Sequence, residues 1–371
     1  MNQPTLQILG TRGIPAGHGG VVAFAEMFAL YLVQQGWYVR VYCQRPSSER
    51  FSIENWKGVE LYKIPVPGSG AFSTIHFDIV SMRMALKCKM PILTLGYNTA
   101  FLNALPRLKG IPNIINMDGI EWKRGKWGPL EKAFFYLNEH LGARFGDHLI
   151  ADHPEIQKHL RKRAKSSKIT VIPYSAKWYG EPQLSHLHSL DLRPGTYLTV
   201  VARSVPENQI LEIVQAFSQR ERGVKLLVLG RYEPDVNPYH RKVHLAASEE
   251  VRFPGPIYQP QIASIRQYAL GYLHGHTVGG TNPSLVEALH AGNPVLAADN
   301  PFNRWVAGSS ALYFSSVSDL ERILDRFLHD PQRQEKMKEG SRRQYQRRFA
   351  YQKVMEDCKE LIVRVVRRRE N

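Results

Sequence analysis

Short apolar runs alternate with segments of helical pattern along nearly the whole chain, and this alternation restricts the fold more than any other feature. Residues 6–10 are typical of a buried strand, a glycine-rich loop follows, residues 21–35 have a helical pattern, and residues 38–42 are typical of the next strand. A strand, a helix and a second strand in this order form a βαβ unit, which implies a mainly parallel sheet. The sequence therefore predicts an α/β fold.

The pattern occurs twice, which predicts two doubly wound domains. The other strands are expected at residues 59–62, 92–95, 113–116, 148–151 and 169–172, and then at 197–201, 225–230, 251–253, 271–274 and 294–297. Residues 177–194 have little pattern and end in a turn signal, so the linker is placed there. We expect domains at residues 1–180 and 190–345, which suits a length of 371 residues, and a basic C-terminal helix at 346–371. Open parallel sheets bind ligands at the carboxyl ends of their strands, so a cleft where both sets of ends face each other is expected.

The charge balance points to a phosphate-bearing partner. Lys and Arg number 49 against 33 Asp and Glu, a net charge of +16, which attracts nucleic acid, anionic lipid or a phosphorylated small molecule without choosing among them. No apolar run approaches the roughly 18 residues of a membrane span. Three distant cysteines, Cys43, Cys88 and Cys358, and no evident secretory signal favour a reduced, cytosolic setting.

The loop at residues 10–20 is the first candidate for ligand binding. It holds five glycines in eleven residues between a strand and a helix, so its backbone can approach a ligand closely and direct amide groups at an anion. Its spacing matches neither the dinucleotide nor the Walker pattern, which weakens oxidoreductase and nucleotidase interpretations. We expect Arg12, Gly13, Gly19 and Gly20 to contact a ligand. A flexible turn without a ligand is the alternative.

The second candidate is the segment at residues 116–127, which follows a strand. It combines two carboxylates, two tryptophans and three basic residues in twelve positions. Tryptophan stacks on sugar faces, while charged groups bind hydroxyls and phosphate. Asp118 is the expected catalytic residue here, with a structural Asx turn as the alternative. The other residues expected to bind a ligand here are Glu121, Trp122, Lys123 and Arg124.

The third candidate is Arg203, which leaves the first strand of the second domain. An arginine at the carboxyl end of a strand can bind a diphosphate and neutralise the charge that develops as it departs. A solvated surface arginine is the alternative.

The strongest candidate is the segment at residues 274–292. A short helix is expected to begin near Asn282, with Pro283 in its first turn and Gly292 at its end, and to point its amide groups at a diphosphate. Glu287, one turn into this helix, is expected to accept hydrogen bonds from a sugar hydroxyl of the nucleotide. His274 and His276 have a spacing that suits a metal, but no further ligands accompany them, so no metal is predicted. The residues expected to bind the diphosphate-bearing ligand here are His276, Gly279, Gly280, Thr281, Asn282, Ser284, Leu285 and Glu287.

These motifs resemble those of retaining glycosyltransferases of family 4, and the resemblance covers nearly the whole chain. Residues 203–207 look like the family's G-R-x-x-P-E-K motif, and residues 282–295 look like its nucleotide-sugar helix, which ends in E-A-x-A-x-G-x-P-V. Residues 10–15, 118–124 and 274–284 are similar to the bacterial rhamnosyltransferase-like branch, whose members build cell-surface polysaccharides. The resemblance implies a GT-B fold: two Rossmann-like domains facing a central cleft, with a C-terminal helix that crosses back.

Two positions depart from the family pattern. The family's first glutamate, eight positions before Glu287, is Gly279 here, and the lysine expected after Pro206 and Glu207 is Asn208. The glutamate usually contacts the transferred sugar, so its loss leaves the identity of the donor open. The missing lysine leaves Arg203 and the helix amides to stabilise the leaving group, with Asn208 at a donor-binding position.

The resemblance implies transfer of a sugar from a nucleoside diphosphate donor, with retention of configuration and without a metal ion or other cofactor. The second domain would hold the nucleotide and the first the acceptor. The resemblance thus implies acceptor binding by Arg12 and by the four residues at 121–124. It implies donor binding by Gly13, Gly19, Gly20 and Asn208 and by the eight residues named above between His276 and Glu287. Deoxythymidine diphosphate rhamnose is the implied donor, and a lipid-linked saccharide at the inner face of the membrane is the implied acceptor. A nucleotide-sugar epimerase or a phosphorylase with the same fold remains an alternative, although no cofactor lysine for a phosphorylase can be placed. Nucleic acid is not an expected partner, because the sequence has no recognised fingerprint for it.

The end of the chain carries much of the excess charge. Residues 341–371 contain ten Lys or Arg against four Asp or Glu, a net charge of +6. A basic amphipathic helix of this kind can bind anionic lipid, which would make the protein peripheral to the cytoplasmic membrane. A helix that packs back across the domains with a solvated charged face is the equal alternative.

Overall fold

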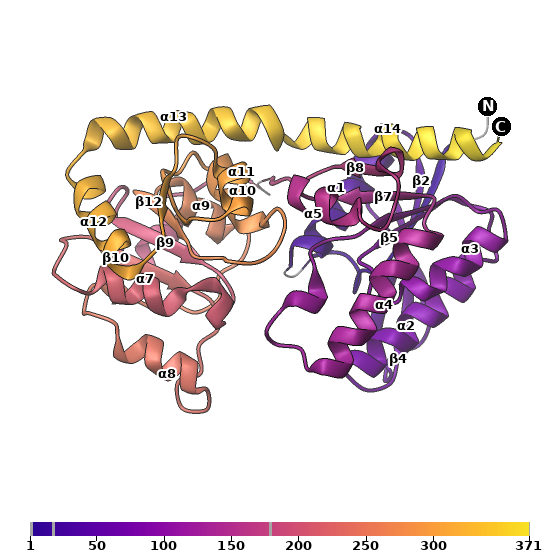
Figure 1. Cartoon of the computed structure of the whole chain (residues 1–371), viewed down its shortest axis with the longest axis horizontal. Coiled ribbons are helices and arrows are strands. Elements are labelled where there is room, and N and C mark those ends of the chain that lie inside the picture. Colours follow the sequence, from indigo (N-terminus) through magenta and orange to yellow (C-terminus); the bar gives the residue numbers. More distant parts are fainter. Residues whose placement is uncertain (1–2, 17–18, 178–179, 371) are drawn as a thin grey trace. The chain divides into compact units, whose positions relative to one another are not determined.

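The computed structural model describes residues 3–16, 19–177 and 180–370, without the side chain of Glu370. Its contacts divide the chain into two compact units. Unit 1 consists of Met1–Tyr174 with Gln352–Asn371, and unit 2 consists of Ser175–Tyr351. Figure 1 shows a sheet with flanking helices in each unit. The end of the chain is thus part of unit 1, whereas the sequence placed it as a separate helix.

Unit 1 contains an eight-stranded sheet with the order β3-β4-β2-β1-β5-β6-β7-β8. All neighbouring strands are parallel except β3 and β4, which are antiparallel. The strands are β1 (Thr5–Leu9), β2 (Tyr38–Pro46), β3 (Ser52–Trp56), β4 (Val59–Val66), β5 (Ile92–Leu95), β6 (Asn113–Asn116), β7 (His148–Ala151) and β8 (Ile169–Val171).

The helices of unit 1 connect these strands. They are α1 (Gly20–Gln34), α2 (Gly70–Ala85), η1 (Ala100–Asn103), α3 (Ala104–Leu108), η2 (Glu121–Lys123), α4 (Pro129–Phe145), α5 (Pro154–Leu160), η3 (Ser166–Lys168) and, from the end of the chain, α14 (Tyr351–Glu370). On one face of the sheet, Leu9, Tyr42 and Ile92 pack with Phe77 and Met82 of α2.

Helix α14 packs on unit 1 through its apolar face. Its buried residues are Val354, Met355, Cys358, Leu361, Ile362 and Val365. The hydroxyl of Tyr31 in α1 donates to Glu356, and Arg369 pairs with Asp147 at 2.6 Å just before β7. The apolar face of the tail is therefore used in packing within unit 1.

Unit 2 contains a six-stranded, fully parallel sheet with the order β11-β10-β9-β12-β13-β14. Its strands are β9 (Tyr197–Val201), β10 (Lys225–Leu229), β11 (Val251–Arg252), β12 (Gly271–His274), β13 (Val295–Ala298) and β14 (Leu312–Phe314). Its helices are α6 (Ser185–His188), η4 (Pro206–Asn208), α7 (Ile210–Phe217), α8 (Pro238–Leu245), α9 (Gln261–Gln267), α10 (Pro283–His290), α11 (Pro301–Ala307), α12 (Val317–Leu328) and α13 (Pro331–Arg348).

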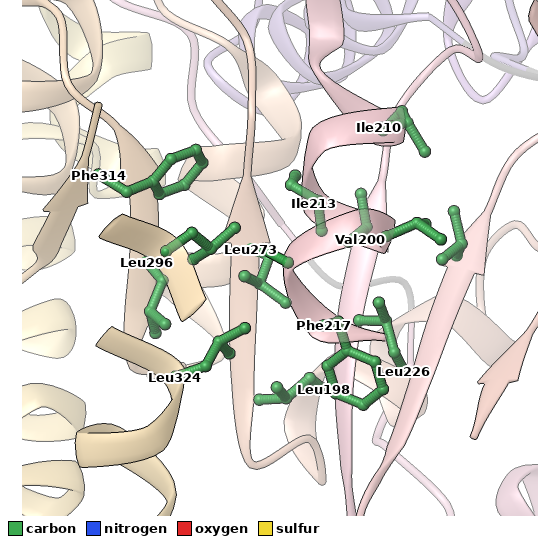
Figure 2. Close-up of a cluster of buried hydrophobic side chains, with 14 of the residues drawn as sticks. Leu198, Val200, Ile210, Ile213, Phe217, Leu226, Leu273, Leu296, Phe314 and Leu324 are labelled. Atoms are coloured by element: carbon green, nitrogen blue, oxygen red, sulfur yellow. The ribbon is translucent and has the colours of Figure 1, made fainter. Parts of the chain in front are cut away.

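Alternate residues of each strand in unit 2 face different helix layers, as expected for a parallel sheet covered on both sides. Leu198 and Val200 of β9 pack with Phe217 of α7 and Leu324 of α12 (Figure 2). On the other face, Tyr272 of β12 packs against α10, α11 and α13. Unit 2 therefore has a core on each side of its sheet.

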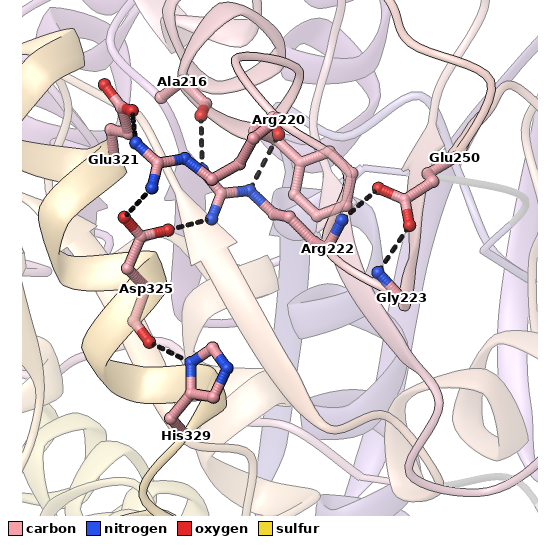
Figure 3. Close-up of polar contacts among 9 residues, drawn as sticks. Ala216, Arg220, Arg222, Gly223, Glu250, Glu321, Asp325 and His329 are labelled. Atoms are coloured by element: carbon pink, nitrogen blue, oxygen red, sulfur yellow. Dashed lines mark hydrogen bonds and ion pairs between the residues drawn. The ribbon is translucent and has the colours of Figure 1, made fainter.

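A polar cluster fixes α7 and α12 near the amino end of β10 (Figure 3). The buried Arg222 donates to the carbonyl oxygens of Ala216 and Phe217, both at 2.8 Å, and pairs with Asp325 of α12. Glu250 accepts from the backbone N–H groups of Arg222 and Gly223 at 2.8 and 2.7 Å. The cluster lies on the amino side of β10, away from the carboxyl ends of the strands.

The predicted α/β class with two doubly wound domains is confirmed. Two strands were not predicted: β3, an exposed antiparallel edge strand, and β14, which has three residues. From Val317 on, the chain forms three helices, α12, α13 and α14, with breaks at residues 329–330 and 349–350, and the helix expected at 346–371 corresponds to the end of α13 and to α14. Among the described residues, no helix is both long and apolar enough to span a membrane.

Candidate functional site

In unit 2, the predicted catalytic and donor residues lie on the loops that follow β9 and β12, two neighbouring strands, and in helix α10, which follows the second loop. The backbone N–H and the hydroxyl of Thr277 both donate to the carbonyl oxygen of Glu207 at 3.0 Å, which joins the two loops. Gly275 makes this close approach possible, because a Cβ there would lie 2.3 Å from the carbonyl oxygen of Asn208. The structure thus brings the Arg203 and His276 segments together.

Arg203 is exposed on the loop after β9. Its guanidinium forms no ion pair or hydrogen bond with the part of the chain that the structure describes, so it is open to an anionic ligand. Asn208, by contrast, is 4% exposed, and its side-chain amide donates to the carbonyl oxygen of Arg203 at 2.8 Å. Asn208 therefore braces the loop that carries Arg203 rather than presenting its own side chain to a ligand.

Helix α10 begins one residue after Asn282, as predicted, and Asn282 is its N-cap. The Oδ1 atom of Asn282 accepts from the backbone N–H of Ser284 at 3.1 Å and from its hydroxyl at 2.9 Å. The N–H of Ser284 is thus satisfied inside the protein, and the amide groups that precede the cap are the better placed to meet a ligand.

The other predicted donor residues divide between surface and core. Gly279 adopts a φ of 135° in open space, and Gly280 is partly exposed beside it. Thr281 is 2% exposed. Leu285 is fully buried in the core under α10, so its side chain cannot contact a donor. The helix turns this side chain toward the sheet, so a donor contact at Leu285 stays a prediction for its backbone.

Glu287 has a partner that the sequence did not indicate. The Arg266 guanidinium, which is fully buried, lies 2.8 Å from the Glu287 carboxylate and donates to the carbonyl oxygen of Ser284 at 3.0 Å. Arg266 also lies over the ring of Tyr272, whose hydroxyl is 2.9 Å from the Ser284 hydroxyl. Arg266 thus orients both Glu287 and the first turn of α10. A single arginine in an apolar helix carries no motif, so no sequence signal pointed to it.

His274 and His276 stack face to face, with ring centroids 4.3 Å apart and an interplanar angle of 7°. Burial, aided by His276 and Arg266, lowers the pKa of His274 well below its ordinary value, so this ring is neutral. Its Nδ1 atom lies 3.2 Å from the Tyr272 hydroxyl. Within the described ranges, no group of three or more His, Cys, Asp or Glu side chains is arranged to hold a metal ion.

In unit 1, the glycine-rich loop follows β1. A Cβ on Gly10 would lie 2.3 Å from the carbonyl oxygen of Leu95, and one on Gly13 would lie 2.6 Å from the Cβ of Cys43, so both positions require glycine for packing. Gly19 is the N-cap of α1 and Gly20 its first residue, while Arg12 is exposed. Gly17 and His18 lie outside the described residues.

Asp118 lies at the carboxyl end of β6 in a left-handed conformation, with φ of 50°. Its backbone N–H donates to Oδ1 of Asn116 at 3.0 Å, so the Asx turn is formed by Asn116, and the Asp118 carboxylate is left to accept from the Tyr174 hydroxyl at 3.1 Å. Burial raises the pKa of the Asp118 carboxyl, against the opposing effects of Arg124 and Tyr174. A partly buried carboxyl with a raised pKa, on a left-handed residue at a strand end, has the features of a functional group.

The residues after Asp118 hold their own loop together. Glu121 pairs with Arg124 at 2.7 Å and with Lys126 at 2.9 Å, and these cations outweigh burial and lower its pKa. The indole N–H of Trp122 donates to the buried Glu139 at 3.1 Å. Of the four predicted acceptor residues, Glu121, Trp122 and Arg124 thus have structural partners, and Lys123 is exposed.

A pocket lies at the carboxyl ends of β1, β2 and β5, under the glycine-rich loop, and the sequence did not indicate it. It is lined by residues of that loop, of α2 and of the segment after β5: Gly10, Thr11, Arg12, Gln44, Thr74, Phe77, Asp78, Thr94, Leu95, Gly96, Asn98 and Thr99. Burial raises the pKa of Asp78 to about 6, although the Thr99 hydroxyl donates to it at 2.8 Å.

Family models match each half of the chain. Residues 193–344 match the family described as glycosyl transferases group 1, and residues 3–177 match a domain of unknown function, DUF1972. None of the curated proteins matches the sequence of this chain.

Solved structures share the fold over nearly the whole chain. Sucrose-phosphate synthase from Thermosynechococcus elongatus superposes with a TM-score of 0.84 at 17% identity, over 98% of this chain and 99% of its own. The HepE protein of Anabaena in complex with UDP-glucose has a TM-score of 0.72 at 13% identity, over 98% of this chain and 100% of its own. WaaG, a glycosyltransferase involved in lipopolysaccharide biosynthesis, has a TM-score of 0.71 at 14% identity, over 96% of this chain and 99% of its own. At these identities the likeness shows the fold, which is GT-B.

Proposed function

We propose that this chain, which has the GT-B fold and a glycosyl transferases group 1 domain in unit 2, moves a sugar from a nucleoside diphosphate donor to a hydroxyl of a lipid-linked saccharide. Configuration at the anomeric carbon is retained. The donor is deoxythymidine diphosphate rhamnose, and the product belongs to a bacterial surface polysaccharide. The resemblance of the motifs in both halves supports these finer assignments.

One observation carries the proposal: the exposed guanidinium of Arg203, which has no partner among the described residues, lies on a loop joined by Thr277 and Glu207 to the segment that leads into α10. A cation and a helix N-terminus on joined loops form a seat for a diphosphate. In the reaction, the bond between the anomeric carbon and the diphosphate oxygen breaks, and a bond from the acceptor oxygen to that carbon forms. Arg203 stabilises the charge on the departing diphosphate.

Asp118 is assigned to the acceptor. The acceptor hydroxyl loses its proton as its oxygen bonds to the sugar, and the Asp118 carboxylate in unit 1 takes that proton. A general base works best when its pKa lies close to the working pH, and burial moves the pKa of Asp118 in that direction.

The donor assignment rests on the nucleotide end of the site. The HepE structure holds UDP-glucose, which supports a nucleotide sugar as the donor class. Here Glu287, oriented by Arg266, is available to a hydroxyl of the nucleotide sugar through its partly exposed side chain. Gly279, where the family has a glutamate that contacts the sugar, supports a donor other than glucose.

The proposed mechanism needs no metal ion. Arg203 supplies the positive charge for the diphosphate, and the backbone amides before α10 supply hydrogen bonds. His274 is neutral, buried and stacked on His276 rather than arranged with acidic ligands.

A surface of unit 1 suits a membrane-bound acceptor. Asp147 accepts from Arg107 of α3 at 3.2 Å and from Arg369 of α14 at 2.6 Å, so these two helices meet there. Leu108 of α3 is 84% exposed and Leu105 is 39% exposed. We call Leu105, Arg107, Leu108, Arg367, Arg368 and Arg369 the α3–α14 surface. Exposed leucines beside arginines can bind anionic lipid through apolar burial and charge together, which supports a position at the cytoplasmic face of the membrane.

The proposal is tested with labelled donors and lipid-linked acceptors extracted from bacterial membranes. Deoxythymidine diphosphate rhamnose and UDP-glucose are each incubated with the full chain and acceptor, with and without a metal chelator. Transfer from the rhamnose donor that survives the chelator is expected. An epimerised donor without a new glycoside would favour the epimerase alternative. Phosphate-dependent release of a sugar phosphate would favour a phosphorylase. Salt-sensitive binding to duplex DNA, without affinity for either donor, would overturn the proposal.

A further inference from the structure

We propose that His240 of α8 is a positioning residue for Arg203, because its ring holds the loop that carries Arg203 against the loop that follows β10. The proposal rests on the transferase function above and deepens it with a residue that no motif in the sequence indicated. His240 is 7% exposed, and both of its ring nitrogens contact other parts of unit 2. It therefore acts on the donor through Arg203 rather than by touching the donor itself.

Each ring nitrogen of His240 contacts a different loop. Nε2 lies 2.9 Å from the carbonyl oxygen of Ser204, and Nδ1 accepts from the backbone N–H of Glu233 at 2.9 Å. A carbonyl oxygen can only accept and a backbone N–H can only donate, so these contacts suit the tautomer that carries its hydrogen on Nε2. The ring thus joins the two loops with one donor and one acceptor.

The contact with Ser204 lies next to Arg203 in the chain. The carbonyl oxygen of Arg203 accepts from the side chain of Asn208 at 2.8 Å and from the backbone N–H of Val205 at 2.9 Å. The carbonyl oxygen of Ser204 is held by His240, so two successive carbonyl groups of the loop are fixed. These contacts set the direction in which the exposed guanidinium of Arg203 leaves the backbone.

The strand ends and the cap of α8 place the ring between the two loops. A Cβ on Gly230, at the end of β10, would lie 2.6 Å from the carbonyl oxygen of Ala202, so glycine allows the two loops to approach each other. Asn237 caps α8 and accepts from the backbone N–H groups of Tyr239 and His240 at 2.9 and 3.3 Å. A side chain on a capped helix can hold a catalytic group within the narrow limits that turnover requires.

Two substitutions separate the two contacts of the ring. Nδ1 of histidine is bonded to Cγ and Nε2 to a δ carbon, so the amide of asparagine can reach the place of Nδ1 and the amide of glutamine that of Nε2. His240→Asn keeps an acceptor for Glu233 and loses the donor to Ser204, whereas His240→Gln does the reverse. His148→Asn is the matched control, because His148 is 4% exposed at the amino end of β7 and its Nε2 lies 2.8 Å from the Thr170 hydroxyl.

The test is a double-mutant cycle in the full-length chain, with Arg203 present and with Arg203→Ala. One readout is kcat for glycoside formation. The other is the dissociation constant of UDP and of deoxythymidine diphosphate, measured by calorimetry, which needs no turnover. Thermal unfolding shows whether each variant is folded at the assay temperature.

We expect His240→Asn to lower kcat about tenfold and to raise the dissociation constant of the nucleotide that binds more tightly about fivefold. In the Arg203→Ala chain the same substitution should change either quantity by less than about twofold, because the group that His240 positions is already gone. His240→Gln should stay within about threefold of the wild type, since the contact with Ser204 remains. His148→Asn should match the wild type in both readouts.

A purely structural role for His240 would give other results. A loss by His240→Asn that is as large in the Arg203→Ala chain as in the wild type overturns the proposal. So does a His240→Asn chain with wild-type kcat and nucleotide affinity, or a larger loss for His240→Gln than for His240→Asn. If His240→Asn is unfolded at the assay temperature, a loss of about tenfold or more in a folded His240→Gln chain overturns it.

Failure of the transferase function shows separately. A wild type that binds a nucleotide but forms no glycoside contradicts the transferase alone, and the calorimetric cycle still decides the role of His240. A wild type that binds neither nucleotide overturns both proposals, because no diphosphate seat remains for Arg203 to serve.

Discussion

The Arg266 guanidinium lies 2.8 Å from the Glu287 carboxylate, and the two groups differ in their access to water: Arg266 is fully buried, whereas the side chain of Glu287 is 31% exposed. A buried cation needs a partner more than a partly solvated carboxylate does. The pair therefore couples the stability of unit 2 to Glu287, the residue that we assign to donor binding. Replacing Arg266 and replacing Glu287 should lower the free energy of unfolding by different amounts.

Glu287→Gln should destabilise the protein more than Arg266→Met does. The glutamine variant leaves a buried guanidinium without its counter-ion, for which we expect a loss of about 3 kcal/mol in the free energy of unfolding. In Arg266→Met, Glu287 can turn toward water and the methionine fills the space, so the loss should be smaller. Urea denaturation of both variants measures the difference. Equal losses, or a larger loss for Arg266→Met, would show that the contact of Arg266 with Ser284 outweighs the ion pair.

Arg203→Ala should lower kcat by about 100-fold to 1000-fold, because Arg203 stabilises the departing diphosphate. The side chain is exposed and forms no ion pair with the described residues, so the melting temperature should not change. Steady-state kinetics and thermal unfolding together check both statements. Arg322→Ala, an exposed arginine of α12 paired with Asp319, is the control. An Arg203→Ala enzyme with normal kcat would remove Arg203 from the mechanism.

Substitutions of Asp118 should separate its carboxylate from its backbone conformation. Asparagine and glycine both tolerate the φ of 50° at this position, whereas alanine does not. Asp118→Asn and Asp118→Gly should therefore fold normally but form glycoside about 100-fold more slowly, because the proton acceptor is gone. Asp118→Ala should in addition melt at a lower temperature. Unchanged transfer by Asp118→Asn would make the residue a purely structural one.

The sequence predicted those parts of the fold and site that depend on local pattern. Strands β5, β6 and β7 are buried on both faces and appear as apolar runs, whereas β3 is exposed on an edge and has no such run. The N-cap of α10 was predictable because Asn282 and Pro283 are adjacent in sequence. Arg266 and Asp78 were not, because each gains its role from partners that only the folded sheet brings near it.

Asp78 should make stability depend on pH in an unusual direction. Burial raises its pKa from 3.8 to about 6, so the folded state holds this proton more tightly than the unfolded state does. For such an acid the stabilising contribution is complete below pH 4 and is lost as the pH rises to about 6. Over this range the free energy of unfolding of the wild type should fall by about 2 to 3 kcal/mol because of Asp78, and this fall should be absent in Asp78→Leu. Urea denaturation at pH 4 and at pH 6.5 measures this; equal pH dependence in both proteins would contradict it.

Replacing the leucines of the α3–α14 surface should weaken membrane binding. Leu105→Gln with Leu108→Gln removes the apolar part, and we expect at least about a tenfold loss of binding to vesicles that contain phosphatidylglycerol. Replacing Arg367, Arg368 and Arg369 with glutamine should lower the free energy of vesicle binding by about 1 kcal/mol for each charge. Only this loss, and not that of the leucine variant, should disappear at high salt. Vesicle sedimentation at two salt concentrations distinguishes the two contributions.

The control for this surface is Leu245→Gln in unit 2, because Leu245 is 80% exposed, close to the 84% of Leu108, but lies at the end of α8. Its binding to vesicles should match that of the wild type. Since the apolar face of α14 is packed against unit 1, the helix can contribute to lipid binding only through its charges, and the leucines of α3 must supply the apolar contact. If the arginine variant loses all binding while the leucine variant loses none, lipid is held by charge alone and α3 plays no part.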